Sequence, residues 1–251
     1  MLIIAHYVDG IDTNNEISNN IDLKADINVN TNQVNSGYNY PYVKEIQNVP
    51  VIKQFPQLPS GCEATTTAML LNWAGIGVDK QDIARIFPKG KLPVLHDGYA
   101  IGSNPNKVFI GDPFSNTGLG VYHTPVATMI DKYLPGQSQD ISGTSFESLL
   151  KVVDSGRPVI VWSTVNLAPA SLYMSWHDEN GDDVVWIKPE HTFLLIGYSN
   201  THVIVNDPNS GKMQRYPIDA FKSSFESLGK QAVTVTDNIV GKVITTYITN
   251  K

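Results

Sequence analysis

The sequence contains a single cysteine among its 251 residues, so no disulfide can form within the chain. The same count excludes a metal site built from several cysteines. It also leaves the redox compartment open, because disulfides are the feature that marks an oxidising one. A lone cysteine is most often a small buried apolar side chain, so a chemical role for it has to be argued from its neighbours.

Basic clusters and long apolar runs are also missing. The formal net charge is -6, and the densest basic stretch, residues 89–91, holds only two lysines. Proteins that bind nucleic acids usually present a basic face, so we expect no nucleic-acid partner. No run of about 18 apolar residues occurs, so we expect no membrane span. The 41% of hydrophobic residues and 17% of charged residues are typical of a globular protein that can bury a core.

The first 45 residues differ in composition from the rest of the chain. Residues 8–40 are rich in Asn, Asp, Ser and Thr and show little apolar periodicity. We therefore predict a tail or linker over residues 1–45 and one domain over residues 46–251. Weak alternation over residues 25–34 is compatible with a minor edge strand. The apolar start, residues 1–5, is too short for an intact signal peptide and fits either the remnant of one or an unstructured start.

Helical patterns come first along the domain and strand patterns later, which predicts an α+β fold with a helical part and a sheet part. The expected helices cover residues 62–74, 79–87, 124–133 and 145–155. The expected strands cover residues 158–165, 191–198, 202–206, 212–217, 232–236 and 243–248. Residues 88–122 hold six glycines and four prolines and predict a loop-rich insertion, and residues 176–183 predict a polar turn.

Cys62 is the first candidate for chemistry. It follows the turn Pro59-Ser60-Gly61 and begins a predicted helix. The positive end of a helix dipole favours a thiolate, which is the nucleophilic form of cysteine. Backbone N–H groups at a helix start can also bind an oxyanion. The alternative is a structural cysteine buried on an alanine-rich helix.

A nucleophilic cysteine needs a base, and His191 is the preferred candidate among six histidines. It begins an apolar strand after a loop that contains Pro189, so it lies at the end of a core element, where a cleft is expected. His202 begins the next strand and is the weaker candidate. His177 lies in an acidic, polar stretch that is typical of a solvated loop.

An orienting acid and an oxyanion donor complete the expected site. Asp207 and His191 both lie eight residues from Ser199, so a hairpin that turns there brings the two together. An Asp in that position can fix the histidine tautomer, although an Asp-Pro pair is also a common turn starter. Gln54 and Gln57 precede Cys62, and either amide could donate to an oxyanion; Gln54 is preferred because it lies near the end of the extended segment.

Several separate motifs, in order along residues 48–235, resemble the peptidase C39-like family. They are VIKQFPQLPSGCEAT (51–65), LNWAG (71–75), FIGDP (109–113), GVY (120–122), GRPVIVW (156–162), EHTFLLIGY (190–198) and VNDPNSG (205–211). The resemblance implies a papain-like cysteine peptidase fold in which the nucleophile helix packs on an antiparallel sheet. It also implies a triad of Cys62, His191 and Asp207, with Gln54 as the oxyanion glutamine.

The family includes peptidase domains of bacteriocin-exporting transporters, but this chain has neither transmembrane segments nor an ATPase motif, so their substrate does not carry over. Stand-alone members are commonly bacterial and exported, which predicts an extracellular or cell-surface location. We expect a peptide or protein substrate and no cofactor. The candidates for substrate contact are Asp112, Tyr122 and Trp176. The alternative is that Asp112 belongs to a turn and that Tyr122 packs on the core. The acidic residues 178–183 resemble a calcium loop only loosely, so we expect no metal.

Three functions remain open at this point. The preferred one is hydrolysis of peptide or amide bonds through an acyl-enzyme on Cys62. The second is a papain-like fold that only binds its partner. The third is acyl transfer or amidase chemistry on cell-wall peptides, which uses the same triad.

Overall fold

A seven-stranded antiparallel sheet forms the centre of the computed structural model, which describes residues 43–239. In sheet order its strands are β12 (Lys212–Pro217), β11 (His202–Asp207), β10 (Glu190–Ser199), β7 (Val159–Thr164), β13 (Ala232–Val235) and β6 (Ser138–Asp140), and β1 (Val43–Glu45) also pairs with β10. Because β7 lies between β10 and β13, it has neighbours on both edges, and all six of its residues are buried. This is the burial that its continuous apolar run predicts.

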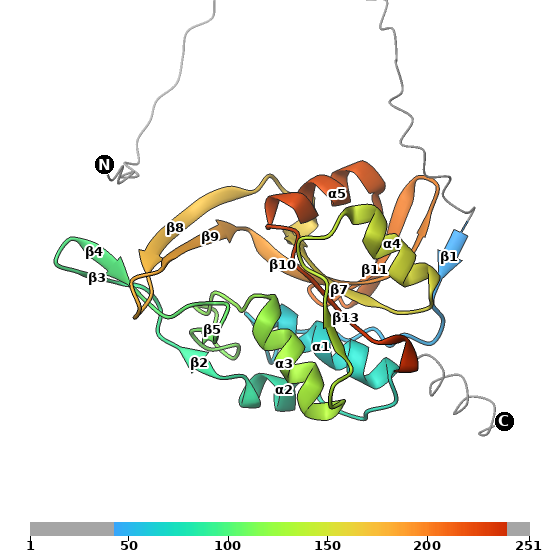
Figure 1. The fold of residues 1–251 in the computed structure, drawn as a ribbon, viewed down its shortest axis with the longest axis horizontal. Coiled ribbons are helices and arrows are strands. Elements are labelled where there is room, and N and C mark those ends of the chain that lie inside the picture. Colours follow the sequence, from blue (N-terminus) through green and yellow to red (C-terminus); the bar gives the residue numbers. More distant parts are fainter. Residues whose placement is uncertain (1–42, 240–251) are drawn as a thin grey trace, which may run out of the picture. The chain divides into compact units, whose positions relative to one another are not determined.

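Helices cover both faces of this sheet (Figure 1). They are α1 (Cys62–Trp73), α2 (Lys80–Ile86), α3 (His123–Tyr133), α4 (Phe146–Asp154), α5 (Ile218–Ser227) and the short 3-10 turn η1 (Val165–Leu167). Helix α5 lies on one face, where Ser224 accepts a hydrogen bond from Ser163 of β7. Helix α1 lies on the other face, where the Thr66 and Thr192 hydroxyls share a 3.2 Å hydrogen bond.

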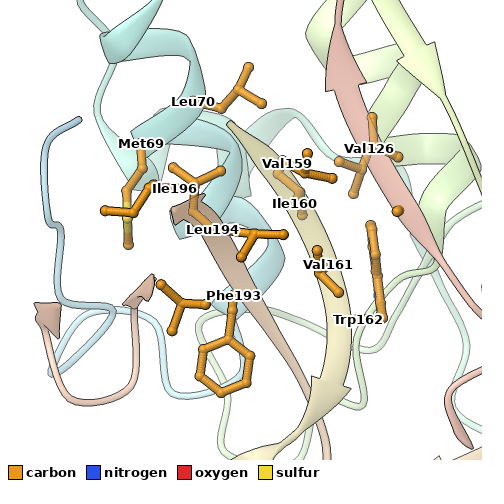
Figure 2. Close-up of a cluster of buried hydrophobic side chains, with 14 of the residues drawn as sticks. Met69, Leu70, Val126, Val159, Ile160, Val161, Trp162, Phe193, Leu194 and Ile196 are labelled. Carbon is orange, nitrogen blue, oxygen red and sulfur yellow. The ribbon is translucent and has the colours of Figure 1, made fainter. Parts of the chain in front are cut away.

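The main core lies between α1 and the central strands. Figure 2 shows Met69 and Leu70 of α1 next to Ile160, Leu194 and other apolar side chains of β7 and β10. These four side chains are fully buried. Burying a Leu, Ile or Met side chain stabilises the fold by about 1.5–3 kcal/mol, so this contact holds the helix firmly on the sheet.

Helix α1 is buried almost all round, since only Asn72 among its twelve residues is not buried. Its three consecutive threonines are poor helix formers because they are β-branched. Their hydroxyls are satisfied inside the helix, since Thr65, Thr66 and Thr67 donate to the carbonyls of Gly61, Cys62 and Glu63. Ala64 and Ala68 keep the helix narrow, so that its backbone can lie close to the sheet.

A separate four-stranded sheet includes residues that were predicted to form a polar turn. Its strands are β3 (Val94–His96), β4 (Tyr99–Ile101), β8 (Ser171–His177) and β9 (Asp183–Lys188). Strands β2 (Lys89–Gly90) and β5 (Phe109–Ile110) form a third sheet of two strands. The predicted polar turn over residues 176–183 is therefore wrong at both ends, because Trp176 and Asp183 belong to strands. Only residues 178–182 form the turn, and Trp176 packs in a second small core with Ile110, Val184 and Trp186.

The other predicted elements of the described region are present with small shifts at their ends. The sequence patterns do not predict helix α5. The expected strand at residues 243–248 and the minor edge strand at residues 25–34 lie outside the described residues. Strand β1 comes just before the predicted start of the domain and pairs with β10. Within residues 43–239, no helix is long and apolar enough to cross a membrane.

Gly61 offers a test of the close packing in front of α1. A Cβ atom at Gly61 would lie 2.7 Å from Cβ of Leu58, which is buried and cannot move aside easily. We expect Gly61→Ala to lower the free energy of unfolding by about 1–3 kcal/mol, the usual cost of overpacking, measured by urea denaturation. Gly77→Ala is the matched control, because a Cβ there meets no atom within 4 Å. Equal stability of the two variants would contradict the steric account.

Candidate active site

The turn before α1 places Cys62 at the first helical position. Gly61 N–H donates to the carbonyl of Leu58, and Leu58 N–H donates to the carbonyl of Gln54, so the chain folds back on itself just before the helix. The first N–H groups of any helix lack partners inside it. Cys62 is buried, with 7% of its surface exposed, and it sits beside these N–H groups at the positive end of α1.

His191 meets Asp207 across the hairpin formed by β10 and β11. Nε2 of His191 lies 2.8 Å from Oδ1 of Asp207, and both side chains are buried. The strand register pairs Leu194 with Asn206, so Asp207 lies at the level of Phe193. His191 is two residues from Phe193 and therefore on the same strand face. The contact that the spacing around Ser199 predicts is present, and it engages Nε2 of the imidazole and not Nδ1.

The Asp207 carboxylate is held in its charged form. Burial alone raises the pKa of this carboxyl, but hydrogen bonds outweigh that effect and hold the pKa below its usual range. Apart from His191, the donors are the backbone N–H of Asn209, at 2.9 Å, and of Ser210, at 3.1 Å. Asp207 can therefore orient the imidazole and stabilise its protonated form.

Cys62 and His191 line the same pocket, of about 240 Å³. Its other lining residues are Gln54, Phe55, Pro59, Ser60, Gly118, Leu119, Val165, Trp186, Lys188, Pro189, Glu190 and Asn209. Strand β9 supplies Trp186 and Lys188, and β10 supplies Glu190. None of these three was among the predicted site residues. The run of β-branched and aromatic residues from Val184 to Ile187 is the sequence signal that could have found the strand.

The two glutamine candidates occupy different positions. Gln54 is buried and lines the pocket, and its Nε2 donates to the carbonyls of Leu58 and Pro59 at 3.2 Å each. Its Oε1 is buried without a hydrogen-bond partner. Gln57 is exposed, and its Oε1 accepts from Nζ of Lys80. Of the two amides, only Gln54 reaches the pocket.

The three candidates for substrate contact lie outside this pocket. Asp112 pairs with Lys89 at 3.1 Å and caps a turn. Trp176 is buried and donates from its indole to the carbonyl of Ser103. Tyr122 stacks on Trp186, with ring centres 5.1 Å apart, so it supports a pocket wall from behind. The pocket residue in this region is Trp186.

The acidic loop between β8 and β9 is organised by Asp178. Its carboxylate accepts hydrogen bonds from Lys107 and Asn104 and from the backbone N–H groups of Asn180 and Asp182. The Lys107 and Asn104 contacts are the first causes that lower the pKa of Asp178 well below its usual range. These partners hold the Asp178 carboxylate at the centre of a tight turn.

The thiol itself has two acidic neighbours. Sγ of Cys62 donates to Oε2 of Glu63 at 3.2 Å, and Glu190 is close by. Burial raises the pKa of the Cys62 thiol well above its usual value, and the charges of Glu63 and Glu190 add to the effect. The raised pKa favours the protonated thiol at neutral pH.

A buried helix that begins at a cysteine, packed on an antiparallel sheet that carries a His–Asp pair, defines the papain-like class of α+β folds. The chain belongs to the Peptidase_C39 like family, whose model matches residues 46–233. The predicted family and fold are thereby confirmed.

Two relatives illustrate the likeness. The chain is 31% identical over 180 residues to the uncharacterised protein YvpB of Bacillus subtilis (strain 168), a match that covers 72% of this chain and 70% of YvpB. It also matches the crystal structure of a candidate C39-like peptidase from Bacillus anthracis with a TM-score of 0.70 and 35% identity. That match covers 77% of this chain and 97% of the other.

The Asp207 environment predicts a pH-dependent loss of stability. Because its folded pKa is lowered, Asp207 contributes stability above its unfolded pKa of about 3.9, and this contribution is lost as pH falls through the folded pKa. We expect Asp207→Asn to lower the free energy of unfolding by roughly 1–2 kcal/mol at pH 7, and the difference from wild type to shrink below pH 4. Urea denaturation from pH 2 to 7 measures it. The exposed Asp97→Asn is the control, and a difference that stays constant with pH would contradict the prediction.

Proposed function

We propose that the protein hydrolyses peptide or amide bonds through a thioester acyl-enzyme on Cys62. One observation carries the proposal: Cys62 opens a buried helix and lines the same pocket as His191, whose other side is held by Asp207. This arrangement supplies a nucleophile, a base and a carboxylate that orients the base, which are the three groups that acyl transfer through a cysteine requires. Membership of the Peptidase_C39 like family supports the same reaction class.

In the acylation step, the thiol proton would move first to His191 and then to the leaving amine. Nδ1 of His191 takes the thiol proton as Sγ forms a bond to the substrate carbonyl carbon, and the imidazolium then donates that proton to the leaving amine as the C–N bond breaks. Water, activated by His191, hydrolyses the thioester. The negative charge of Asp207 stabilises the imidazolium at each stage.

The oxyanion would be bound at the start of α1. The backbone N–H of Cys62 is one donor, because the helix start leaves it without a partner in the helix. Gln54 is the second. Its Nε2 contacts the carbonyls of Leu58 and Pro59 in the resting protein, so one of these bonds would be exchanged for the oxyanion.

Cys62→Ala provides the direct test of the nucleophile. We expect turnover of a fluorogenic peptide library to disappear, because no thioester can form, while the circular dichroism spectrum and the thermal midpoint stay close to those of the wild type. Analysis of the products with water and with an added amine then separates hydrolysis from acyl transfer. Turnover that survives in the alanine variant would refute the assignment.

His191→Ala tests the base without requiring a known substrate. The buried thiol needs a proton acceptor, so we expect alkylation of Cys62 by iodoacetamide at pH 7 to slow by about tenfold or more. His202→Ala is the matched control, because this histidine begins the neighbouring strand β11 and lies outside the pocket lining. Equal alkylation rates in the wild type and both variants would favour a protein that binds its partner without catalysis.

A further inference from the structure

Two carboxyl groups lie close to the thiol, that of buried Glu63 and that of half-buried Glu190, and the proposed mechanism uses neither of them. Sγ of Cys62 and carboxylate oxygens of Glu63 and Glu190 lie within 4.8 Å of one another. Glu63 comes from α1 and Glu190 from β10, so the two meet where the helix start packs on the sheet. Each is next in sequence to a proposed catalytic residue, Cys62 or His191.

The contacts of the two carboxyls are unequal. Oε2 of Glu63 accepts from the Cys62 thiol, and its Oε1 accepts from the backbone N–H of Val121 at 2.7 Å. Oε1 of Glu190 is buried and has no hydrogen-bond partner. A buried carboxylate oxygen without a donor is costly, whereas a protonated carboxyl can itself donate to a neighbour.

Gly120 leaves room for the two carboxyls. It has a φ of +142°, and a Cβ there would lie 2.3 Å from Oε1 of Glu63 and 3.1 Å from Oε2 of Glu190. Any larger residue would push into this space. The loop that carries Gly120 therefore covers both acids with backbone and brings no charge to them.

Positive charge does not compensate these acids. None of the ion pairs formed within residues 43–239 includes Glu63 or Glu190. Lys188 of β9 lines the pocket, but its Nζ lies 3.2 Å from the centre of the Tyr173 ring. His191 follows Glu190 on β10 and is already paired with Asp207.

Two neighbouring carboxyls in a buried site cannot both be ionised at low cost. Burial raises the pKa of Glu63 to about 7, and burial together with the charge of Glu63 raises the pKa of Glu190 well above its usual range. The other groups that face the acids are Tyr122, whose pKa is raised mainly by burial, and the backbone of Thr192, which favours the Cys62 thiolate. At neutral pH the two glutamates therefore hold at least one proton between them.

We propose that Glu63 and Glu190 act as a proton-sharing pair of positioning residues that controls whether Cys62 is a thiol or a thiolate. The inference rests on the proposed role of Cys62 as nucleophile. When Glu63 is ionised, its Oε2 accepts the S–H proton and keeps the sulfur neutral. When the shared proton sits on Glu63, its O–H donates to the sulfur, which then accepts one hydrogen bond and releases its own proton to His191. The position of one proton thus reverses the direction of the Glu63–Cys62 hydrogen bond.

The pair can be observed directly in the wild-type chain. The sequence has only seven glutamates, so selective ¹³C labelling of glutamate carboxyls gives a spectrum that can be assigned by substitution. We expect at least one carboxyl to remain protonated at pH 7 and its signal to be absent from the Glu63→Gln or the Glu190→Gln spectrum. Titration of all seven carboxyls below pH 5 would overturn the proposal, whether or not any variant folds.

The pH profile of alkylation tests the control of Cys62. The amide introduced by Glu63→Gln would keep an acceptor for Val121 N–H and offer a donor to the sulfur, so this variant mimics the protonated acid. We expect Glu63→Gln to react with iodoacetamide about tenfold faster than wild type at pH 8, the effect of one pKa unit, with a smaller difference at pH 5.5. Glu190→Gln removes the source of the shared proton and leaves Glu63 ionised, so we expect it to react no faster than wild type at pH 8. The exposed Glu226→Gln is the control and should follow the wild type.

A purely structural role, such as capping Val121 N–H, predicts that Glu63→Gln has the alkylation profile of the wild type, and that result would overturn the proposal. The outcome is independent of the test of the base. Loss of the His191 effect would refute the proposed mechanism, yet it would leave the carboxyl titration of the wild type as it is.

Discussion

The burial of the first turn of α1 against β10 is the constraint on which the rest of the structure depends. Small residues on α1 and the Thr66–Thr192 hydrogen bond bring the helix backbone close to the strand. Cys62 therefore lies beside the start of the strand that carries His191, and both enter one pocket. The turn at Gly61 is tight for the same reason, because a longer or bulkier approach would lift the helix start off the sheet.

This burial also raises the pKa values of the ionisable groups around Cys62. It shields the Cys62 thiol, the Glu63 carboxyl and one oxygen of the Glu190 carboxyl from water, and it thereby favours their neutral forms. Neither carboxyl has an ion-pair partner among residues 43–239. On the far side of His191, Asp207 has backbone and imidazole donors and stays charged. Under the proposed mechanism, the proton count of this cluster, and not the charge of Asp207, would set the reactivity of Cys62.

The wall of the pocket comes from the four-stranded sheet. Strand β9 runs straight into β10 through Pro189, so Trp186 and Lys188 reach the site from a sheet that packs mainly on its own small core. Tyr122, from the loop that also covers the buried acids, stacks behind Trp186. Changes in this sheet would therefore alter the shape of the pocket without touching the residues proposed for chemistry.

The sequence by itself determined the α+β class, the helix at Cys62 and the hairpin that joins His191 to Asp207, because these depend on local periodicity and on spacing around one turn. It did not reveal β8 and β9, since the polar residues 178–182 lie between two short apolar stretches that do not alternate, nor the choice of Trp186 over Trp176 as the pocket residue. Only the tertiary structure decided that Glu63 and Glu190 meet at the thiol. They lie 127 positions apart on different elements, and their interaction arises from burial, which no local pattern encodes.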